Sequence, residues 1–330
     1  MGDGYTPRMT QTHDATQRQG DSQGRDADHP GELPARGWKE VLSRVRVEIK
    51  RDRVPLLSAG VAFFTLLALV PGLAALISIY GLVGDPSQVE QRVTDLMGAA
   101  PAEARNLVTS QARSILEQSN GATGIGLIVS IALALWSASS GMQHLVEAVN
   151  MAYDEEEGRG FLKLRAVALS LTVGLIVFLL VAIVVIAALP ALMADWGAPG
   201  PVRVLVGIAR WPLLAGLLLT ALALLYRYAP DRDQPKWSWV SPGAIAATVL
   251  WVVGSLLFSL YTANFGKYNE TYGSLGAIVI VMLWLMLTAY VVIAGAELNA
   301  ESERQTAVDS TKGHPESMGR RGAVAADTLG

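Results

Sequence analysis

The sequence predicts an all-α polytopic membrane protein: a bundle of six transmembrane helices, with two short amphipathic helices in the first external loop. Three observations predict this fold class. Hydrophobic residues make up 51% of the 330 residues and charged residues only 17%, whereas a soluble domain usually carries about a quarter charged residues. The charges crowd into the two ends and a few loops. Between them lie six segments that are apolar enough to cross a bilayer.

Each apolar segment is close to the roughly 20 residues that a helix needs to cross about 30 Å of hydrocarbon. The fourth segment departs most from this pattern, because Arg210 and Pro212 lie near its start. Arg210 beside Trp211 is typical of a membrane interface, with the guanidinium reaching outward; a pore-lining arginine is the alternative. The predicted spans are 56–83, 124–144, 166–193, 207–227, 241–263 and 273–296.

The distribution of Lys and Arg predicts the orientation. The N-terminal region, the 145–165 loop, the 227–240 loop and the C-terminal tail together hold 20 of these residues, against five on the opposite side. The positive-inside rule places the richer side in the cytoplasm. With an even number of spans, both termini are expected to be cytoplasmic.

The two ends of the chain differ from the middle. Residues 1–36 contain too little apolar surface to bury, and we expect a disordered cytoplasmic tail there; residues 303–330 are expected to form a second one. The membrane domain then covers 37–302. It begins with a juxtamembrane helix in which one stripe is apolar. This helix is expected either to lie on an anionic membrane surface or to be a solvated lead-in to the first span. The stripe consists of Trp38, Val41, Leu42, Val45 and Ile49.

The first external loop, 84–123, is the only long one. Asp85-Pro86 is a good helix start, an N-cap followed by proline at the first helical position. Apolar residues then recur at helical spacing on both sides of Pro101. We expect two short amphipathic helices that cap the outer ends of the bundle, or alternatively form a substrate lid.

The end of the second span carries the first candidate site. Small and hydroxyl residues there, including Ser137 and Ser140, permit close helix approach and interhelical hydrogen bonds. Glu147 and Asn150 follow, three residues apart and therefore on one helix face. A tightly packed helix crossing is one interpretation, and the polar lining of a translocation path is the other.

The end of the last span carries the second candidate site. Glu297 lies at the C-terminal end of this helix, where the helix dipole is unfavourable for a carboxylate. Cationic partners are therefore expected nearby, and Arg159, Lys163 and Arg165 are on the same side of the membrane. A structural salt bridge is one role for Glu297, and coupling of transport to a proton or ion is the other.

Three stretches of the sequence together resemble the YihY/BrkB family of bacterial inner-membrane proteins. The resemblance covers most of residues 38–301 and rests on residues 63–83, on WSAS with a downstream NxxY in 135–165, and on the run from Tyr228 through YGSLGA to GAELNAE. Ala229-Pro230-Asp231 stands where the family often has Leu-Pro-Asn. The resemblance implies a six-helix inner-membrane protein without a settled activity. Members were once labelled ribonuclease BN, and envelope-lipid or solute transport is among the proposals for the family.

Composition narrows the functions further. The chain has no cysteine and only four histidines, which excludes disulfides, thiolate catalysis and cysteine-ligated metal. No cluster of residues in the sequence suits the metal site or the acid–base pair of a nuclease. We therefore expect a protein that is not an enzyme, with no cofactor, no metal site and no nucleic-acid partner. Translocation of an envelope lipid or small solute is the preferred prediction, with membrane lipids as partners. A membrane scaffold for envelope assembly is the alternative, and the oligomeric state stays open.

Overall fold

The computed structural model describes residues 23–83, 125–188, 193, 196, 199–263 and 274–330. Regular structure in these residues is helical, apart from one isolated β-bridge between Pro235 and Thr311. The described part of the chain is therefore all-α, as the sequence predicts. The two helices expected in the 84–123 loop lie outside the described residues.

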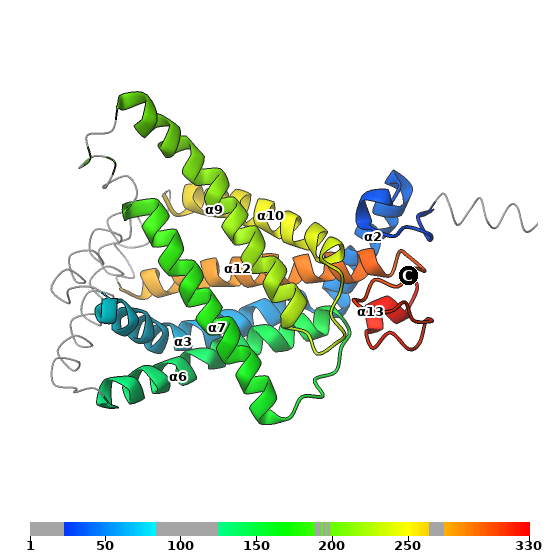
Figure 1. The fold of residues 1–330 in the computed structure, drawn as a ribbon, viewed down its shortest axis with the longest axis horizontal. Helices are drawn as coiled ribbons and strands as arrows, with labels where there is room; N and C mark the ends of the chain where they lie inside the picture. Colours follow the sequence, from blue (N-terminus) through cyan, green and yellow to red (C-terminus); the bar gives the residue numbers. More distant parts are fainter. Residues whose placement is uncertain (1–22, 84–124, 189–192, 194–195, 197–198, 264–273) are drawn as a thin grey trace, which may run out of the picture.

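Long helices dominate the architecture (Figure 1). Six of them occur in the described ranges: α3 (Val54–Val83), α6 (Ile125–Ala152), α7 (Phe161–Ile183), α9 (Gly200–Tyr228), α10 (Trp237–Ala263) and α12 (Ser274–Glu303). A π-helical turn, η2 (Val184–Ala188), continues α7. These helices match the positions of the apolar segments. The fourth segment is the exception in length, because α9 begins at Gly200 rather than near 207 and holds Arg210 and Pro212 in its interior.

Four stretches in the described residues are long and apolar enough to cross a membrane. They are Phe161–Ile186, Gly200–Tyr228, Trp237–Thr262 and Ile278–Glu303. A fifth arises if the helix Ala35–Arg51 (α2) and Val54–Leu69, which meet at an angle of 62°, are taken as one broken span. The structure thus holds four or five candidate spans by length and composition.

The long helices form a ring through their main contacts. Going round, α3 packs on α6, α6 on α7, α7 on α9, α9 on α10, α10 on α12, and α12 returns to α3. In addition, α12 contacts α6 across the ring. The last helix is therefore the element that joins the two sides of the bundle.

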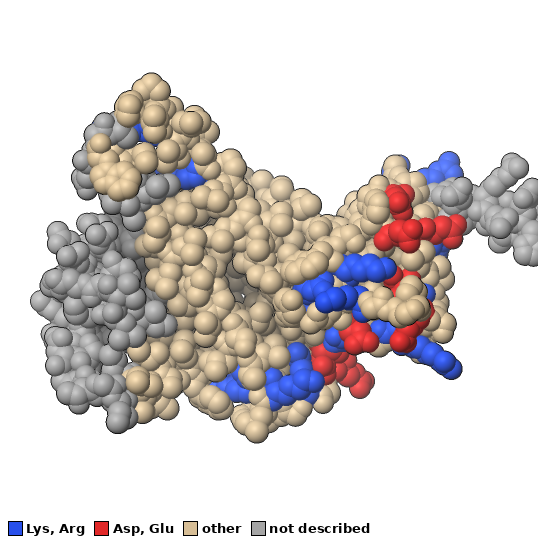
Figure 2. All heavy atoms as spheres, viewed as in Figure 1, with Lys and Arg blue, Asp and Glu red and all other residues tan. Residues whose placement is uncertain are grey.

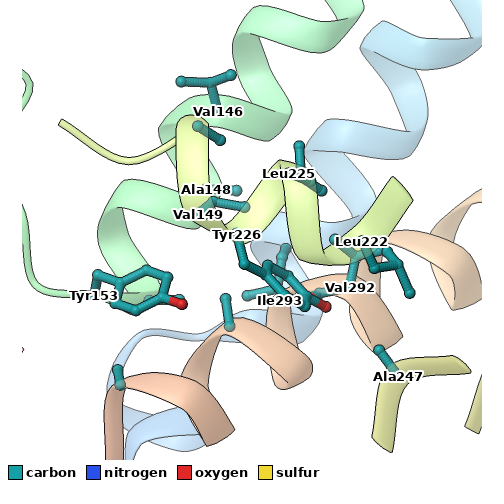
Figure 3. Packing of buried hydrophobic residues seen from close by; sticks show 14 of the residues in the cluster. Val146, Ala148, Val149, Tyr153, Leu222, Leu225, Tyr226, Ala247, Val292 and Ile293 are labelled. Carbon is teal, nitrogen blue, oxygen red and sulfur yellow. The ribbon is translucent and has the colours of Figure 1, made fainter. Parts of the chain in front are cut away.

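The buried core is concentrated at one end of the bundle, and Figure 3 shows part of it from close by. In α9 no described side chain before Leu222 is buried, and in α10 none is buried from Val249 to Thr262. The core itself is rich in small residues, such as Ala244, Ala247 and Ala296, which let helix backbones approach closely. The opposite halves of α9 and α10 expose large apolar side chains, as lipid-facing helices do.

The charged residues gather at the same end as the core (Figure 2). There α2 packs along α12, with Val41 and Val45 buried and Leu42 57% exposed. The apolar stripe predicted for the juxtamembrane helix is thus divided between contact with the protein and exposure. We refer to this region, which holds α2, the end of α12 and the residues after it, as the charged end.

The C-terminal segment differs from the prediction of a disordered tail. Residues 304–330 fold back over the charged end and include a short helix, α13 (Val324–Asp327), in which Ala325 joins the main core. Arg321 explains how so polar a segment can order, because its side chain donates hydrogen bonds to the backbone carbonyls of Ala307, Glu316 and Ala326. These hydrogen bonds satisfy buried polar groups of the segment, while Ala325 and Ala326 supply buried apolar surface.

The N-terminal region also differs in part. Residues 1–22 lie outside the described residues, but part of 23–36 is packed. Ala27 and Leu33 are buried against Trp239, with Trp38 alongside. The backbone carbonyl of Gln23 accepts a hydrogen bond from Gln305 Nε2 at 2.8 Å. The described part of the N-terminal region and the C-terminal segment therefore meet at the charged end.

Candidate functional site

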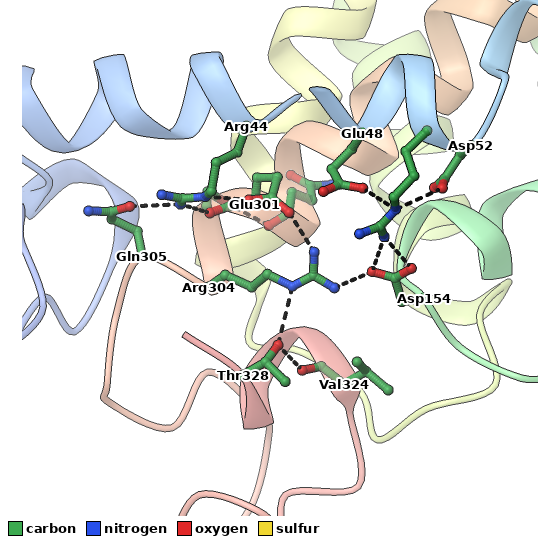
Figure 4. Close-up of polar contacts among 12 residues, drawn as sticks. Arg44, Glu48, Asp52, Asp154, Glu301, Arg304, Gln305, Val324 and Thr328 are labelled. Carbon is green, nitrogen blue, oxygen red and sulfur yellow. Dashed lines mark hydrogen bonds and ion pairs between the residues drawn. The ribbon is translucent and has the colours of Figure 1, made fainter. Parts of the chain in front are cut away.

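A network of ion pairs joins α2, the end of α6 and the end of α12 at the charged end (Figure 4). Its centre is Glu301, whose carboxylate pairs with Arg44 Nε at 2.5 Å and with Arg304 Nη1 at 2.5 Å. Arg304 also pairs with Asp154, which accepts a hydrogen bond from Arg51 Nη2 at 2.8 Å. Because the Glu301 side chain is 1% exposed, its pairs are screened less by water than surface pairs are. The network fixes three helix ends relative to one another.

A second ion pair joins the loop between α9 and α10 to the end of α12. Arg232 Nη2 and Glu303 Oε2 are 2.6 Å apart, and Ser310 Oγ donates a further hydrogen bond to the same carboxylate oxygen at 2.8 Å. The Arg232 guanidinium also lies 4.9 Å from the centre of the Tyr153 ring. Burial alone would lower the pKa of Arg232, but the adjacent Glu303 raises it, so the arginine keeps its charge.

Asn150, at the end of α6, connects two loops. Its Nδ2 donates to Glu157 Oε2 at 2.8 Å, and its Oδ1 accepts from the backbone N–H of Asp231 at 2.8 Å. Glu157 in turn pairs with Arg159, whose hydrogen bonds hold the pKa of that carboxyl below its usual value. Arg159 also donates to the carbonyl of Ala229 at 2.9 Å. Asn150 and Arg159 are thus both engaged in holding loops together.

Glu297 has a different environment from these paired groups. It lies on α12, is 2% exposed, and its Oε1 has no hydrogen-bond partner. The charges that act on it most strongly are acidic: Asp52, Glu48, Asp154 and Glu301. No ion pair within the described residues joins it to the three cationic partners expected from the sequence. These acids are themselves paired with Arg44, Arg51 or Arg304, so within the described residues Glu297 is a buried carboxylate without an ion-pair partner of its own.

Close helix crossings surround this carboxylate. A Cβ atom built on Gly243 of α10 would lie 2.0 Å from the carbonyl oxygen of Gly295 of α12, so only glycine fits. The backbone N–H of Gly243 donates to Asn299 Oδ1 at 2.7 Å. On the other side, the hydroxyl of Tyr226 donates to the carbonyl of Val292 at 2.9 Å. α9, α10 and α12 are thus locked together within two turns of Glu297.

The candidate residues on α6 and α7 lie on the flank of the bundle. Ser137 is exposed, Ser140 donates to its carbonyl, and Glu147 interacts with His144 Nδ1 at 3.2 Å. Lys163 is exposed, while Arg165 is buried against Trp136 with its guanidinium 4.4 Å from the ring centre. The structure therefore separates the candidates into two groups. Asn150, Arg159 and Glu297 belong to the packed charged end, and the remaining five lie along α6 and the start of α7.

Comparison with known proteins agrees with this architecture. A sequence model of the family described as Virulence factor BrkB matches residues 45–319. The chain belongs to the BrkB family. It is 34% identical over 270 residues to the ribonuclease-like protein YfkH of Bacillus subtilis (strain 168), covering 79% of this chain and 93% of YfkH. A UPF0761 membrane protein of Tolumonas auensis is 27% identical over 251 residues, covering 76% and 80% of the two chains. No solved structure matches the chain significantly.

Membership of the BrkB family, together with several long apolar helices, identifies a multi-pass membrane protein. The family match ends at residue 319 and so includes much of the C-terminal segment that packs on the charged end. Within the described part of the chain, no group of three or more His, Asp or Glu side chains is arranged to hold a metal ion.

Sequence reasoning missed most of the charged-end network. Arg44, Glu301, Arg304, Arg232 and Glu303 are ordinary-looking charges beside apolar segments, and nothing in their spacing indicates partners more than 70 residues away. One signal was available for Asn299 and Glu301, because both belong to the GAELNAE ending by which the chain resembles the BrkB family.

Proposed function

We propose that this BrkB-family protein translocates an envelope lipid or a small solute across the bacterial plasma membrane. The observation that carries the proposal is Glu297, a buried carboxylate with an unpartnered oxygen in the last long helix. Ionisable groups at membrane depth are costly and often mark substrate or ion pathways. A buried carboxylate with an unpartnered oxygen can take up a proton or a small cation, and so provides a means of coupling.

The proposal includes a six-span topology with both termini in the cytoplasm. The long helices α3, α6, α7, α9, α10 and α12 each have 23–30 residues, enough to cross about 30 Å of hydrocarbon at 1.5 Å per residue. The end at which α2 and α13 lie is the one enriched in Lys and Arg, as expected for the cytoplasmic side. In this arrangement Glu297 lies near the cytoplasmic ends of the helices.

Reconstitution tests the proposal directly. Purified full-length protein in lipid vesicles is expected to carry flux of a labelled lipid, solute or ion, and Glu297→Gln is expected to reduce it strongly. Glu156→Gln is the matched control, because Glu156 is an exposed loop carboxylate on the same side. An untargeted lipid and metabolite comparison of a deletion strain, rescued by wild type or by Glu297→Gln, would identify the substrate. Vesicles without flux of any of the three classes would refute the proposal.

A scaffold for envelope assembly is the second candidate, and the ion-pair network at the charged end favours it. Asn150, Arg159 and Asp154 are all paired, as expected of a rigid platform. A scaffold requires no coupling carboxylate. Full rescue of the deletion strain by Glu297→Gln, together with envelope proteins that co-purify with the chain, would favour the scaffold over the transporter.

We further propose that the protein is not a ribonuclease, although YfkH is named ribonuclease-like. Metal-assisted hydrolysis of RNA requires clustered ligands or a positioned acid–base pair. Purified protein is expected to leave RNA intact in the presence of Mg²⁺ or Mn²⁺. Metal-dependent cleavage that co-purifies with the protein would contradict this proposal.

A further inference from the structure

One face of α6 carries a row of polar residues that we call the α6 polar stripe: Ser137, Ser140, His144 and Glu147. Their spacing of three and four residues places them on one side of the helix. Ser137 is exposed, and the side chains of His144 and Glu147 are 32% and 44% exposed. At 1.5 Å per residue the stripe is about 15 Å long, about half the thickness of the hydrocarbon core.

The stripe faces away from the bundle, between two neighbouring helices. On one side α3 packs closely, since a Cβ on Gly141 would meet Ala68 Cβ at 2.9 Å, and the ring of Phe64 stacks on His144 at 3.7 Å. On the other side α7 packs through Arg165. The main helix contacts include α3 with α6 and α6 with α7. The stripe on α6 is therefore flanked by α3 on one side and by α7 on the other.

Exposed polar groups at this position require a polar environment. Hydroxyl, imidazole and carboxylate groups on a membrane helix are unfavourable against acyl chains. Contacts within α6 satisfy the stripe only in part, through Ser140 with the Ser137 carbonyl and Glu147 with His144 and Gln143. The exposed parts of the His144 and Glu147 side chains still contact the surroundings of α6.

A buried cation lies next to the stripe. Arg165 is 8% exposed, and its Nε has no partner. Its other nitrogens donate to neutral groups, Gln143 Oε1 at 3.2 Å and the Trp136 carbonyl at 2.6 Å. No carboxylate within the described residues forms an ion pair with it. Gln143 also donates to Glu147 at 3.3 Å, so one amide links the cation to the end of the stripe. The surplus positive charge favours an anionic group outside.

We propose that the α6 polar stripe is a membrane-facing track for the headgroup of a phospholipid, with Arg165 attracting the phosphodiester while the acyl chains stay in the bilayer. Glu147, at the charged end of the track, suits a headgroup ammonium. The inference rests on the proposed function and names phospholipid as its substrate class. Arg165 acts here as a positioning residue through its charge.

The absence of native cysteine permits a direct test. Ser140→Cys places a single thiol on the stripe, 12 residues before the end of α6 at Ala152. Val249→Cys is the matched control, 12 residues after the start of α10 at Trp237 and 55% exposed on an apolar surface. Both full-length variants are placed in vesicles of phosphatidylethanolamine and phosphatidylglycerol that contain a phospholipid with a maleimide on its headgroup. Covalent labelling then reports headgroup contact.

Ser140→Cys is expected to label at least about fivefold faster than Val249→Cys, the effect of one interfacial cation on an anionic headgroup. In the Ser140→Cys background, Arg165→Gln should remove most of this advantage and Arg165→Lys should keep it. Arg210→Gln should change nothing, although Arg210 also stacks on a tryptophan, Trp211, at 5.4 Å. Equal labelling of the two cysteines would overturn the inference, as would a disulfide-linked dimer of Ser140→Cys, because a second copy would then cover the stripe.

Flux measured in the same vesicles separates this inference from the proposed function. Fast labelling of Ser140→Cys without lipid, solute or ion flux would support a headgroup-binding stripe and refute translocation. Flux with equal labelling of the two cysteines would support translocation and overturn the stripe.

Discussion

Arg232 and Glu303 form an ion pair in which both side chains are 0% exposed, with a nitrogen–oxygen distance of 2.6 Å. The arginine comes from the loop between α9 and α10, and the glutamate is the last residue of α12. Ser310 and the ring of Tyr153 complete the surroundings. The pair and its two neighbours thus join four parts of the chain at a point that water does not reach.

Breaking this pair on one side is expected to destabilise the charged end strongly. Arg232→Met leaves the Glu303 carboxylate buried without its cation, which costs about 3–5 kcal/mol. Unfolding of the purified protein in detergent, followed by circular dichroism or by denaturant titration, measures the loss. The double variant Arg232→Met/Glu303→Leu removes both charges and should recover much of the stability. A single variant as stable as wild type would show that the pair contributes little.

Gly243 should not tolerate a side chain. In Gly243→Ala the new methyl group would have to lie 2.0 Å from the Gly295 carbonyl oxygen, so α10 and α12 must separate at a cost of about 1–3 kcal/mol or more. Gly174→Ala in α7 is the matched control, because nothing lies within 4 Å of the corresponding position and alanine is the better helix former. Expression and thermal unfolding of the two variants should therefore change in opposite directions. Equal behaviour would contradict the close crossing.

The sequence predicted the helices well because each is long and continuously apolar. The 56–83 and 241–263 segments, for example, correspond to α3 (Val54–Val83) and α10 (Trp237–Ala263) within a few residues. Hydropathy depends only on local composition, so it finds helices without knowledge of their neighbours. The start of α9 was placed too late because Arg210 and Pro212 interrupt the apolar run, although the helix continues through both.

The candidate site was predictable only in part. Glu297 and Asn150 were identified as unusual polar residues near apolar spans, but their partners depend on how distant segments meet. Asn150 binds the backbone of Asp231, 81 residues away, and no periodicity reports such a contact. The C-terminal segment was expected to be disordered because it has little apolar content. In the structure Arg321 donates hydrogen bonds to backbone carbonyls of the segment and Ala325 packs in the main core, contacts that composition does not reveal.

Glu157 is expected to make the protein less stable in acid. Hydrogen bonds from Arg159 hold the folded-state pKa of Glu157 below the ordinary 4.5. Its stabilisation is therefore present above that value and is lost as the pH falls through the folded-state pKa. Between about pH 6 and about pH 3, Glu157→Gln should show a shallower loss of unfolding free energy than wild type. An unchanged slope would contradict the assignment.

Glu155 provides the opposite case and hence a control. Burial raises the folded-state pKa of Glu155 above 4.5, so Glu155 is protonated at a higher pH in the folded state than in the unfolded state. The stability that this protonation contributes is lost as the pH rises through the folded-state pKa. Glu155→Gln should therefore make the loss of stability in acid steeper, where Glu157→Gln makes it shallower. Denaturant titrations at a series of pH values distinguish the two slopes.

Val324 tests whether the C-terminal segment is held on the bundle. Its backbone N–H donates to Glu155 Oε1 at 2.8 Å, and it is the first residue of α13. Val324→Pro removes this donor without disturbing the helix, because proline is accepted at the first helical position and Ala323 before it is extended, with φ −154° and ψ 117°.

Losing a hydrogen bond to a carboxylate should cost about 1–2 kcal/mol after the entropic benefit of proline. Val324→Ala keeps the N–H and should cost less. Limited proteolysis should then release the segment after residue 304 faster in Val324→Pro than in Val324→Ala, and equal rates would show that this hydrogen bond does not hold it.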